Sequence, residues 1–194
     1  MSPRYLPMTD KKGKLIVISG PSGTGKGTVI SKLLKLRPEL AFSISATTRN
    51  ARPGETHGIE YLFIPKHEFK DMINNNEFLE YAEYVGEFYG TPASPIKKCL
   101  ESGITVILDI EVQGAKQVIK KMPEAITIFI VAPDMKELEK RLRGRGTDPE
   151  EKLLARLERA RLEIEEKIHY NHVVINDNAL RAAKEILEII DRKD

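Results

Sequence analysis

The stretch Gly20-Pro21-Ser22-Gly23-Thr24-Gly25-Lys26 lies between the apolar run Leu15 to Ser19 and apolar pairs at helical spacing that begin at Val29. This pattern predicts a strand, a glycine-rich turn and a helix, in that order. Backbone N–H groups in such a turn, with the positive end of the following helix, form a site for phosphate, and Lys26 can reach the outer phosphates of a nucleotide. The alternative interpretation is a turn that only connects strand to helix.

The end of this motif departs from the usual pattern, in which Lys is followed by a Ser or Thr whose hydroxyl binds Mg²⁺. Here Gly27 follows Lys26, and the first hydroxyl belongs to Thr28. This Gly-Lys-Gly-Thr ending resembles that of nucleoside monophosphate kinases. The resemblance implies that Mg²⁺ is held by phosphate oxygens and largely through water by Asp109, with Thr28 as a further candidate, and not by a side chain at position 27.

The composition is that of an ordinary globular chain with one core: 194 residues, of which 41% are hydrophobic and 31% charged. A net charge of +2 is too small to indicate nucleic acid or membrane as the main partner, and we predict no protein partner. Cys99 is the single cysteine, and no apolar leader precedes Lys14, so we expect a cytoplasmic protein. The four scattered histidines are interpreted as surface residues.

Strands alternate with helices along most of the chain, which predicts an α/β fold with a parallel sheet covered by helices. A flexible lead-in is expected over residues 1–13. The expected helices cover about 26–37, 94–102, 112–122, 135–143, 150–169 and a final segment through 190, and the expected strands cover 15–19, 104–109, 126–131 and 173–176.

Residues 42–92 differ from their flanks because they are rich in strand patterns and aromatic side chains. We expect strands over 42–48, 61–64 and 78–84, a short helix bearing Phe69, and a turn-rich segment over 86–91. The whole is predicted to be one domain, with a core of about 14–41 and 93–194 and an inserted β-rich subdomain at about 42–92.

Within this insertion, Arg49, Arg52, Tyr61 and Tyr89 offer guanidinium and phenol donors suited to a second phosphate group. Glu80 can only accept hydrogen bonds when ionised, which suits the N1–H and exocyclic amine of guanine. The alternative is that the arginines are solvated surface residues and the tyrosines belong to the core.

Together with the glycine-rich loop, a set of motifs resembles the guanylate kinase family from about Lys14 to the C-terminus. They are Ser45-Ala-Thr-Thr-Arg49-Asn-Ala-Arg52-Pro-Gly-Glu55, Gly58-Ile-Glu-Tyr61, Phe78-Leu-Glu80-Tyr81, Tyr89-Gly90-Thr91, Ile107-Leu-Asp109-Ile-Glu111 and Arg145-Gly-Thr. The resemblance implies a phosphate-loop kinase fold with an inserted GMP-binding subdomain and a mobile lid.

It also implies roles for individual residues. The residues assigned to ATP are Gly20, Pro21, Ser22, Gly23, Thr24, Gly25, Lys26, Gly27, Thr28, Arg141, Arg145 and Asn176. The residues assigned to GMP are Ser45, Arg49, Arg52, Tyr61, Glu80, Tyr89, Gly90, Thr91, Asp109, Glu111, Arg145 and Arg156. Asp109 also fits a carboxylate associated with Mg²⁺, and its alternative role is a cap at the end of a strand.

The lid is expected over about 141–158, where glycines flank Arg145. The resemblance assigns stabilisation of the transferring phosphoryl group to Lys26, Arg145 and Arg156, with Arg52 on the acceptor side. A nucleic-acid patch is the alternative, but Glu150 and Glu151 interrupt the run of arginines.

The activity implied is transfer of the γ-phosphate of ATP to GMP, giving ADP and GDP, with Mg²⁺ as cofactor and ATP as co-substrate. Two alternatives stay open at this point. One is a guanylate-kinase-like module that binds proteins and has lost catalysis, and the other is a kinase for a different nucleoside monophosphate.

Overall fold

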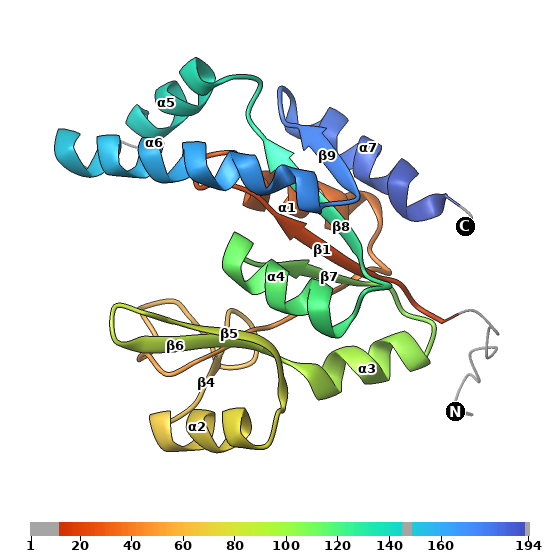
Figure 1. Ribbon diagram of the computed structural model, residues 1–194. Helices are drawn as coiled ribbons and strands as arrows, with labels where there is room; N and C mark the ends of the chain where they lie inside the picture. The colour runs from red at the N-terminus through yellow and green to blue at the C-terminus, as the bar shows by residue number, and fades with distance from the viewer. Residues whose placement is uncertain (1–11, 145–148, 193–194) are drawn as a thin grey trace. The chain divides into compact units, whose positions relative to one another are not determined.

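The computed structural model describes residues 12–144 and 149–192 (Figure 1). By its internal contacts the chain divides into two compact units. The small-sheet unit combines Met1–Leu15 with Glu39–Val106, and the phosphate-loop unit combines Ile16–Pro38 with Ile107–Asp194. Within the described ranges, no helix has the length and apolar character needed to cross a membrane.

The phosphate-loop unit consists of alternating strands and helices, as predicted. Its elements are β1 Leu15–Ser19, α1 Lys26–Leu36, β7 Val106–Asp109, α4 Val112–Lys121, β8 Ile126–Val131, α5 Met135–Arg143, α6 Glu150–Glu165, the 3₁₀ turn η1 Glu166–His169, β9 His172–Ile175 and α7 Ala179–Asp191. The helix expected over 150–169 therefore ends at Glu165 and continues as η1.

The central sheet has the order β2-β7-β1-β8-β9 among the described residues, and β1, β8 and β9 pair in parallel. Ile16, Val17 and Ile18 of β1 are fully buried, because a parallel strand flanked by helices is covered on both faces. In Figure 1, α4 lies before the sheet and α1 behind it, which confirms the predicted fold class. The loop after β1 and the residues after β7 and β9 therefore follow the carboxyl ends of parallel strands, where α/β sheets bind ligands.

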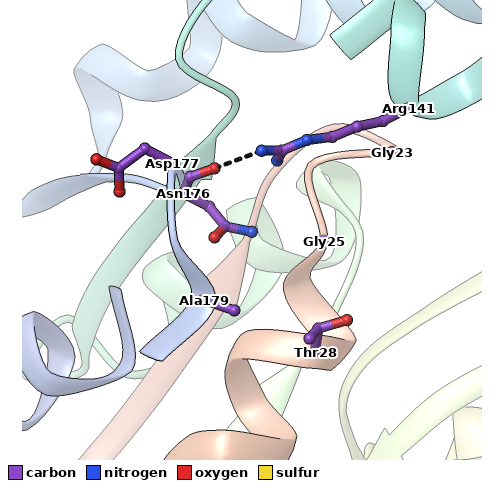
Figure 2. A pocket seen from close by; sticks show the side chains of 7 residues that line it. All are labelled: Gly23, Gly25, Thr28, Arg141, Asn176, Asp177 and Ala179. Atoms are coloured by element: carbon purple, nitrogen blue, oxygen red, sulfur yellow. Dashed lines mark hydrogen bonds between the residues drawn. The ribbon is translucent and has the colours of Figure 1, made fainter. Parts of the chain in front are cut away.

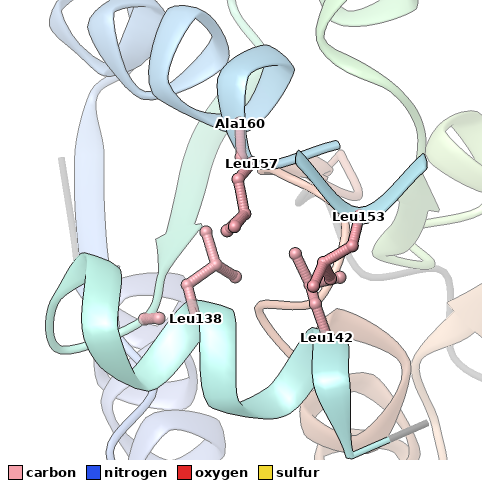
Figure 3. Close-up of a cluster of buried hydrophobic side chains, with 6 residues drawn as sticks. Leu138, Leu142, Leu153, Leu157 and Ala160 are labelled. Carbon is pink, nitrogen blue, oxygen red and sulfur yellow. The ribbon is translucent and has the colours of Figure 1, made fainter. Parts of the chain in front are cut away.

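Helix α6 is held against α5 by a separate apolar cluster (Figure 3). Leu138 and Leu142 of α5 face Leu153, Leu157 and Ala160 of α6, and all five are buried. The spacing of three and four residues places each set on one face of its helix. This packing sets the rotation of α6 about its own axis, and that rotation directs Arg156 toward the phosphate loop.

The small-sheet unit contains a second sheet of order β4-β3-β6-β5 among the described residues. Its elements are β2 Ala41–Phe42, β3 Ala46–Thr47, β4 Leu62–Phe63, α2 Lys66–Asn74, β5 Phe78–Tyr84, β6 Glu87–Pro92 and α3 Ala93–Glu101. Phe69 of α2 is fully buried and stacks on Phe78 with ring centroids 4.3 Å apart, so α2 closes one face of this sheet.

Two predictions for this region were wrong. The run 42–48 is not one strand, because β2 ends at Phe42 and belongs to the central sheet, whereas β3 begins at Ala46 and belongs to the second sheet. The turn expected over 86–91 is confined to Val85 and Gly86, both with positive φ, and Glu87 already starts β6. Two such residues form the tight hairpin turn that matches the strand twist.

The predicted flexible lead-in extends too far. Positions 1–11 lie outside the described residues, but the Gly13 N–H donates to the Leu100 carbonyl at 2.8 Å. Gly13 is therefore fixed to the end of α3.

Candidate active site

The glycine-rich loop connects β1 to α1, and glycines such as Gly20 and Gly25 combine a positive φ with a close neighbour that a side chain would meet. Gly20 has φ +144°, and a Cβ there would lie 2.2 Å from the Ile130 carbonyl oxygen of β8. Gly25 has φ +84°, and a Cβ there would lie 2.6 Å from the Asn176 amide nitrogen. The loop thus packs closely on β8 and on the end of β9, and it leads directly into the N-terminus of α1, the positive end of that helix.

Lys26 is the first residue of α1, and its ammonium donates to the Gly20 carbonyl at 2.8 Å. The same nitrogen lies 3.9 Å from an Asp109 carboxylate oxygen at the end of β7. Burial raises the pKa of Asp109, Lys26 opposes this effect, and the nearby Glu111 adds to it. A carboxylate that is costly to ionise in this position gains stability from an added cation.

The described residues contain no group of three or more His, Cys, Asp or Glu side chains arranged to hold a metal ion. A cation at Asp109 would therefore take most of its ligands from nucleotide phosphates and water, which is how Mg²⁺ is usually bound in phosphoryl-transfer enzymes. A Cβ at Gly27 would meet open space, with no atom within 4 Å.

A cavity of about 310 Å³ opens beside the loop (Figure 2). Asn176, only 4% exposed, donates its amide to the Thr24 carbonyl at 2.7 Å. The Arg141 guanidinium donates to the Asn176 carbonyl at 2.9 Å and to the Thr24 carbonyl at 3.3 Å. The predicted ATP residues Arg141 and Asn176 are thereby joined to the loop. The cavity is lined by Gly23, Gly25, Thr28, Arg141, Asn176, Asp177 and Ala179.

Thr28 was a candidate metal ligand, and it forms part of the lining of this cavity together with Ala179 (Figure 2). Asp177 and Ala179 were not identified from the sequence. The one available signal was their place directly after Asn176, at the carboxyl end of a predicted parallel strand.

The flank of α6 that faces the loop carries two arginines. The Arg156 guanidinium donates to the Ser22 hydroxyl at 2.6 Å, so a predicted catalytic residue contacts the phosphate loop. Arg159, which the sequence did not single out, lies 3.4 Å from a Glu111 carboxylate oxygen. Arg145 lies outside the described residues, as does the centre of the predicted lid.

In the small-sheet unit, Arg49 is held by a carboxylate that was not given a role from the sequence. Both Arg49 Nη atoms donate to Glu55, at 2.6 and 2.8 Å, and the Arg52 N–H donates to the same carboxylate at 2.8 Å. Hydrogen bonding to Arg49, and to a smaller extent to the Arg52 N–H, lowers the pKa of Glu55 to about 2. A glutamate six residues after an arginine, across a Pro-Gly turn, was the signal that could have indicated this pair.

Aromatic rings complete the surroundings of Arg49. Its guanidinium carbon lies 5.0 Å from the Tyr61 ring centroid and 5.5 Å from that of Phe63. Tyr61 and Tyr89 meet edge to face with centroids 6.1 Å apart. The structure therefore brings together Arg49, Tyr61 and Tyr89, whereas the Arg52 side chain is exposed. Charge and hydroxyl donors gathered in this way suit a phosphate group.

Glu80 of β5 and Thr91 of β6 form a second pair in the same sheet. The Thr91 hydroxyl donates to a Glu80 carboxylate oxygen at 2.5 Å, and the two residues are 0% and 7% exposed respectively. Gly90 allows the close approach, because a Cβ there would lie 2.9 Å from the Glu80 carbonyl oxygen. Ser45, half-buried, precedes β3 in the same sheet. A buried carboxylate of fixed orientation can accept hydrogen bonds selectively.

Comparison with known proteins gives a consistent result. The family model described as guanylate kinase matches residues 12–193. A guanylate kinase from Prochlorococcus marinus subsp. pastoris is 49% identical over 177 residues, which cover 91% of this chain and 96% of that protein. A guanylate kinase from Trichodesmium erythraeum is 51% identical over 166 residues, covering 86% and 89%.

Solved structures agree with these relatives. The crystal structure of guanylate kinase from Anaplasma phagocytophilum matches with a TM-score of 0.74 and 33% identity, covering 94% of this chain and 87% of that one. A Thermus thermophilus structure at 19% identity and a TM-score of 0.53 shares the fold alone.

Proposed function

The chain belongs to the guanylate kinase family and transfers a phosphoryl group from ATP to GMP, and we propose that its two units divide this work. The phosphate-loop unit binds ATP, and the small-sheet unit binds the phosphate of GMP and supplies most of the groups for its base. The observation that carries this division is the presence of two separate clusters of anion-binding groups. One surrounds Lys26 at the start of α1, and the other surrounds Arg49 in the second sheet.

ATP binding uses the loop and the adjoining cavity. The N–H groups of Gly20 to Thr28 and the N-terminus of α1 bind the phosphates, and Lys26 exchanges the Gly20 carbonyl for the β- and γ-phosphates. The adenosine part enters the cavity formed with Asn176 and Arg141. Thr28, in the lining of that cavity, contacts the nucleotide and is a further candidate ligand for Mg²⁺.

Mg²⁺ fits this site through Asp109, whose burial makes a neighbouring cation favourable. When bound, the ion neutralises charge between the β- and γ-phosphates. Asp109 would hold it largely through water, since the residue after Lys26 is glycine and offers no hydroxyl. The same carboxylate, 3.9 Å from Lys26, orients the ammonium toward the phosphates.

GMP binding uses the second sheet. Arg49, Arg52, Tyr61 and Tyr89 bind its phosphate, and Glu55 fixes Arg49 in place for this contact. Two arginines and one glutamate leave a net positive charge, which attracts the phosphate dianion. Guanine is recognised by Ser45 and Glu80 of the small-sheet unit and by Glu111 of the phosphate-loop unit, and Thr91 orients the Glu80 carboxylate.

The transfer step is an in-line displacement. An oxygen of the GMP phosphate forms a bond to the γ-phosphorus while the bond from that phosphorus to the ADP oxygen breaks. The protein contributes alignment and positive charge, supplied by Lys26, Arg52, Arg145 and Arg156 around the equatorial oxygens. The enzyme acts on free nucleotides in the cytoplasm, without a nucleic-acid, membrane or protein partner.

A coupled assay with Mg-ATP that compares GMP, dGMP, AMP and UMP tests the assignment of the acceptor site. We expect GMP to be preferred, and Glu80→Gln to reduce the use of GMP selectively because the amide presents an N–H to a guanine donor. If Glu80→Gln leaves the preference for GMP over AMP unchanged, Glu80 does not read the base.

A further inference from the structure

Helix α6 carries a line of charged side chains on the flank beside its apolar stripe. Arg156, Arg159 and Glu163 are spaced three and four residues apart, which places them on one face. Arg156 reaches Ser22 of the phosphate loop, and Arg159 Nη2 lies 3.4 Å from Glu111 Oε2. Arg159 Nε also donates to Glu163 at 2.7 Å. Arg159 thus connects α6 to the residue that precedes α4.

Glu111 lies directly before helix α4. It is the N-cap residue of α4, yet its side chain forms no capping hydrogen bond within the described structure. Its carboxylate is directed instead toward Arg159. The pair is exposed, with side-chain exposures of 59% for Arg159 and 66% for Glu111. The Glu111 carboxylate, which we assign to guanine binding, is therefore occupied by the guanidinium of Arg159.

The Arg159 guanidinium and the guanine base offer similar hydrogen-bond donors to a carboxylate. A guanidinium offers N–H groups in a plane with a fixed fork geometry, and guanine offers N1–H and an exocyclic amine along one edge. Both suit a carboxylate. We propose that Arg159 competes with guanine for Glu111, holding the carboxylate before GMP binds and releasing it to the base. This inference rests on the proposed role of Glu111 in guanine binding.

The surroundings suit such an exchange. Glu163 is only 14% exposed and retains its hydrogen bond to Arg159 Nε, so the guanidinium keeps a charged partner after release. An exposed ion pair shifts an equilibrium by about fivefold at most, so the contact tunes GMP affinity without blocking the site. Salt weakens exposed pairs, and the competition therefore fades at high ionic strength.

The test measures the dissociation constant of GMP by calorimetry in the absence of ATP. The proteins are wild type, Arg159→Ala, Glu111→Gln and the double variant. We expect Arg159→Ala to tighten GMP binding by about two- to fivefold at low salt, and Glu111→Gln to weaken it. The double variant should then bind GMP with the same dissociation constant as Glu111→Gln alone, because the carboxylate for which Arg159 and guanine compete is gone.

Lys116→Ala is the matched control. Lys116 on α4 binds Glu166 of η1 at 2.7 Å, so it joins α4 to the segment after α6 without touching Glu111. It should leave GMP affinity unchanged. If Glu111→Gln weakens GMP binding but Arg159→Ala does not tighten it, Arg159 does not compete with guanine, although Glu111 still binds the base. If Glu111→Gln has no effect, the assignment of Glu111 to guanine fails, and the competition fails with it.

Discussion

The Asn176 side-chain amide donates to the Thr24 carbonyl at 2.7 Å, joining the end of β9 to the phosphate loop across 152 positions of sequence. Both residues are buried, at 4% and 1% exposure. The Thr24 carbonyl also receives Arg141, but at the longer distance of 3.3 Å. Asn176 is therefore the main support of the loop on this side.

Asn176→Ala should destabilise the fold and weaken ATP binding together. Leaving the buried Thr24 carbonyl with its weaker partner costs about 1–3 kcal/mol, measurable by denaturant unfolding, and KM for ATP should rise while KM for GMP changes little. Asn176→Asp should be worse than Ala, because it sets a carboxylate against the carbonyl. Equal effects on both KM values would contradict a local role.

Gly25→Ala tests the packing between Asn176 and the phosphate loop by changing the loop residue. The new Cβ would lie 2.6 Å from the Asn176 amide, in a backbone with φ +84°. Gly54→Ala is the control, because φ is +88° there and no atom lies within 4 Å. The positive φ alone costs about 1–2 kcal/mol in either variant. Gly25→Ala should lose more stability than Gly54→Ala, and should also raise KM for ATP; equal losses would show that Asn176 moves aside freely.

Glu55→Gln should change both acid stability and GMP use. The folded-state pKa of Glu55 is lowered from 4.5 to about 2, so its stabilising effect is present above about pH 4.5 and is lost as the pH falls toward 2. Unfolding followed from pH 6 to pH 2 should therefore show a smaller loss of stability in the variant than in wild type. KM for GMP should rise severalfold at neutral pH, since Arg49 loses its bidentate partner.

Glu60→Gln is the control for that experiment. Glu60 lies in the same segment, and its carboxylate accepts a hydrogen bond from the Thr56 N–H at 2.7 Å instead of one from an arginine. It should leave KM for GMP near the wild-type value. A rise as large as that of Glu55→Gln would mean that the segment as a whole, and not the hold on Arg49, governs GMP binding.

The regular elements were predictable because their patterns are local. Strand Ile126–Val131 and helix Met135–Arg143 have the predicted bounds, since apolar runs and helical spacing are read from neighbouring residues. The division of 42–48 was not predictable, because pairing partners far along the chain decide it. Ala41 donates to Thr105, whereas Ala46 pairs with Gly90.

The candidate site also contains some residues whose role local sequence patterns predict and others whose contacts they do not. Glycines and a lysine between a strand and a helix predict phosphate binding by themselves. The pairings of Arg156 with Ser22 and of Arg159 with Glu111 join residues 134 and 48 positions apart, and no local pattern encodes them. Glu55 is the intermediate case, since it lies close to Arg49 in sequence but becomes its partner only through the turn between them.

Arg156→Ala should act mainly on turnover. Its guanidinium donates to the Ser22 hydroxyl at 2.6 Å, beside the loop that we assign to the ATP phosphates. Removing an arginine that stabilises transition-state charge lowers kcat by about 10³–10⁵-fold, with a smaller change in either KM. Ser22→Ala removes the hydroxyl but keeps the charge, so its effect on kcat should be far smaller. Arg161→Ala, on the same helix beside Glu158, is the control. If Arg156→Ala raised KM for ATP and left kcat intact, Arg156 would serve ground-state binding and not the transfer step.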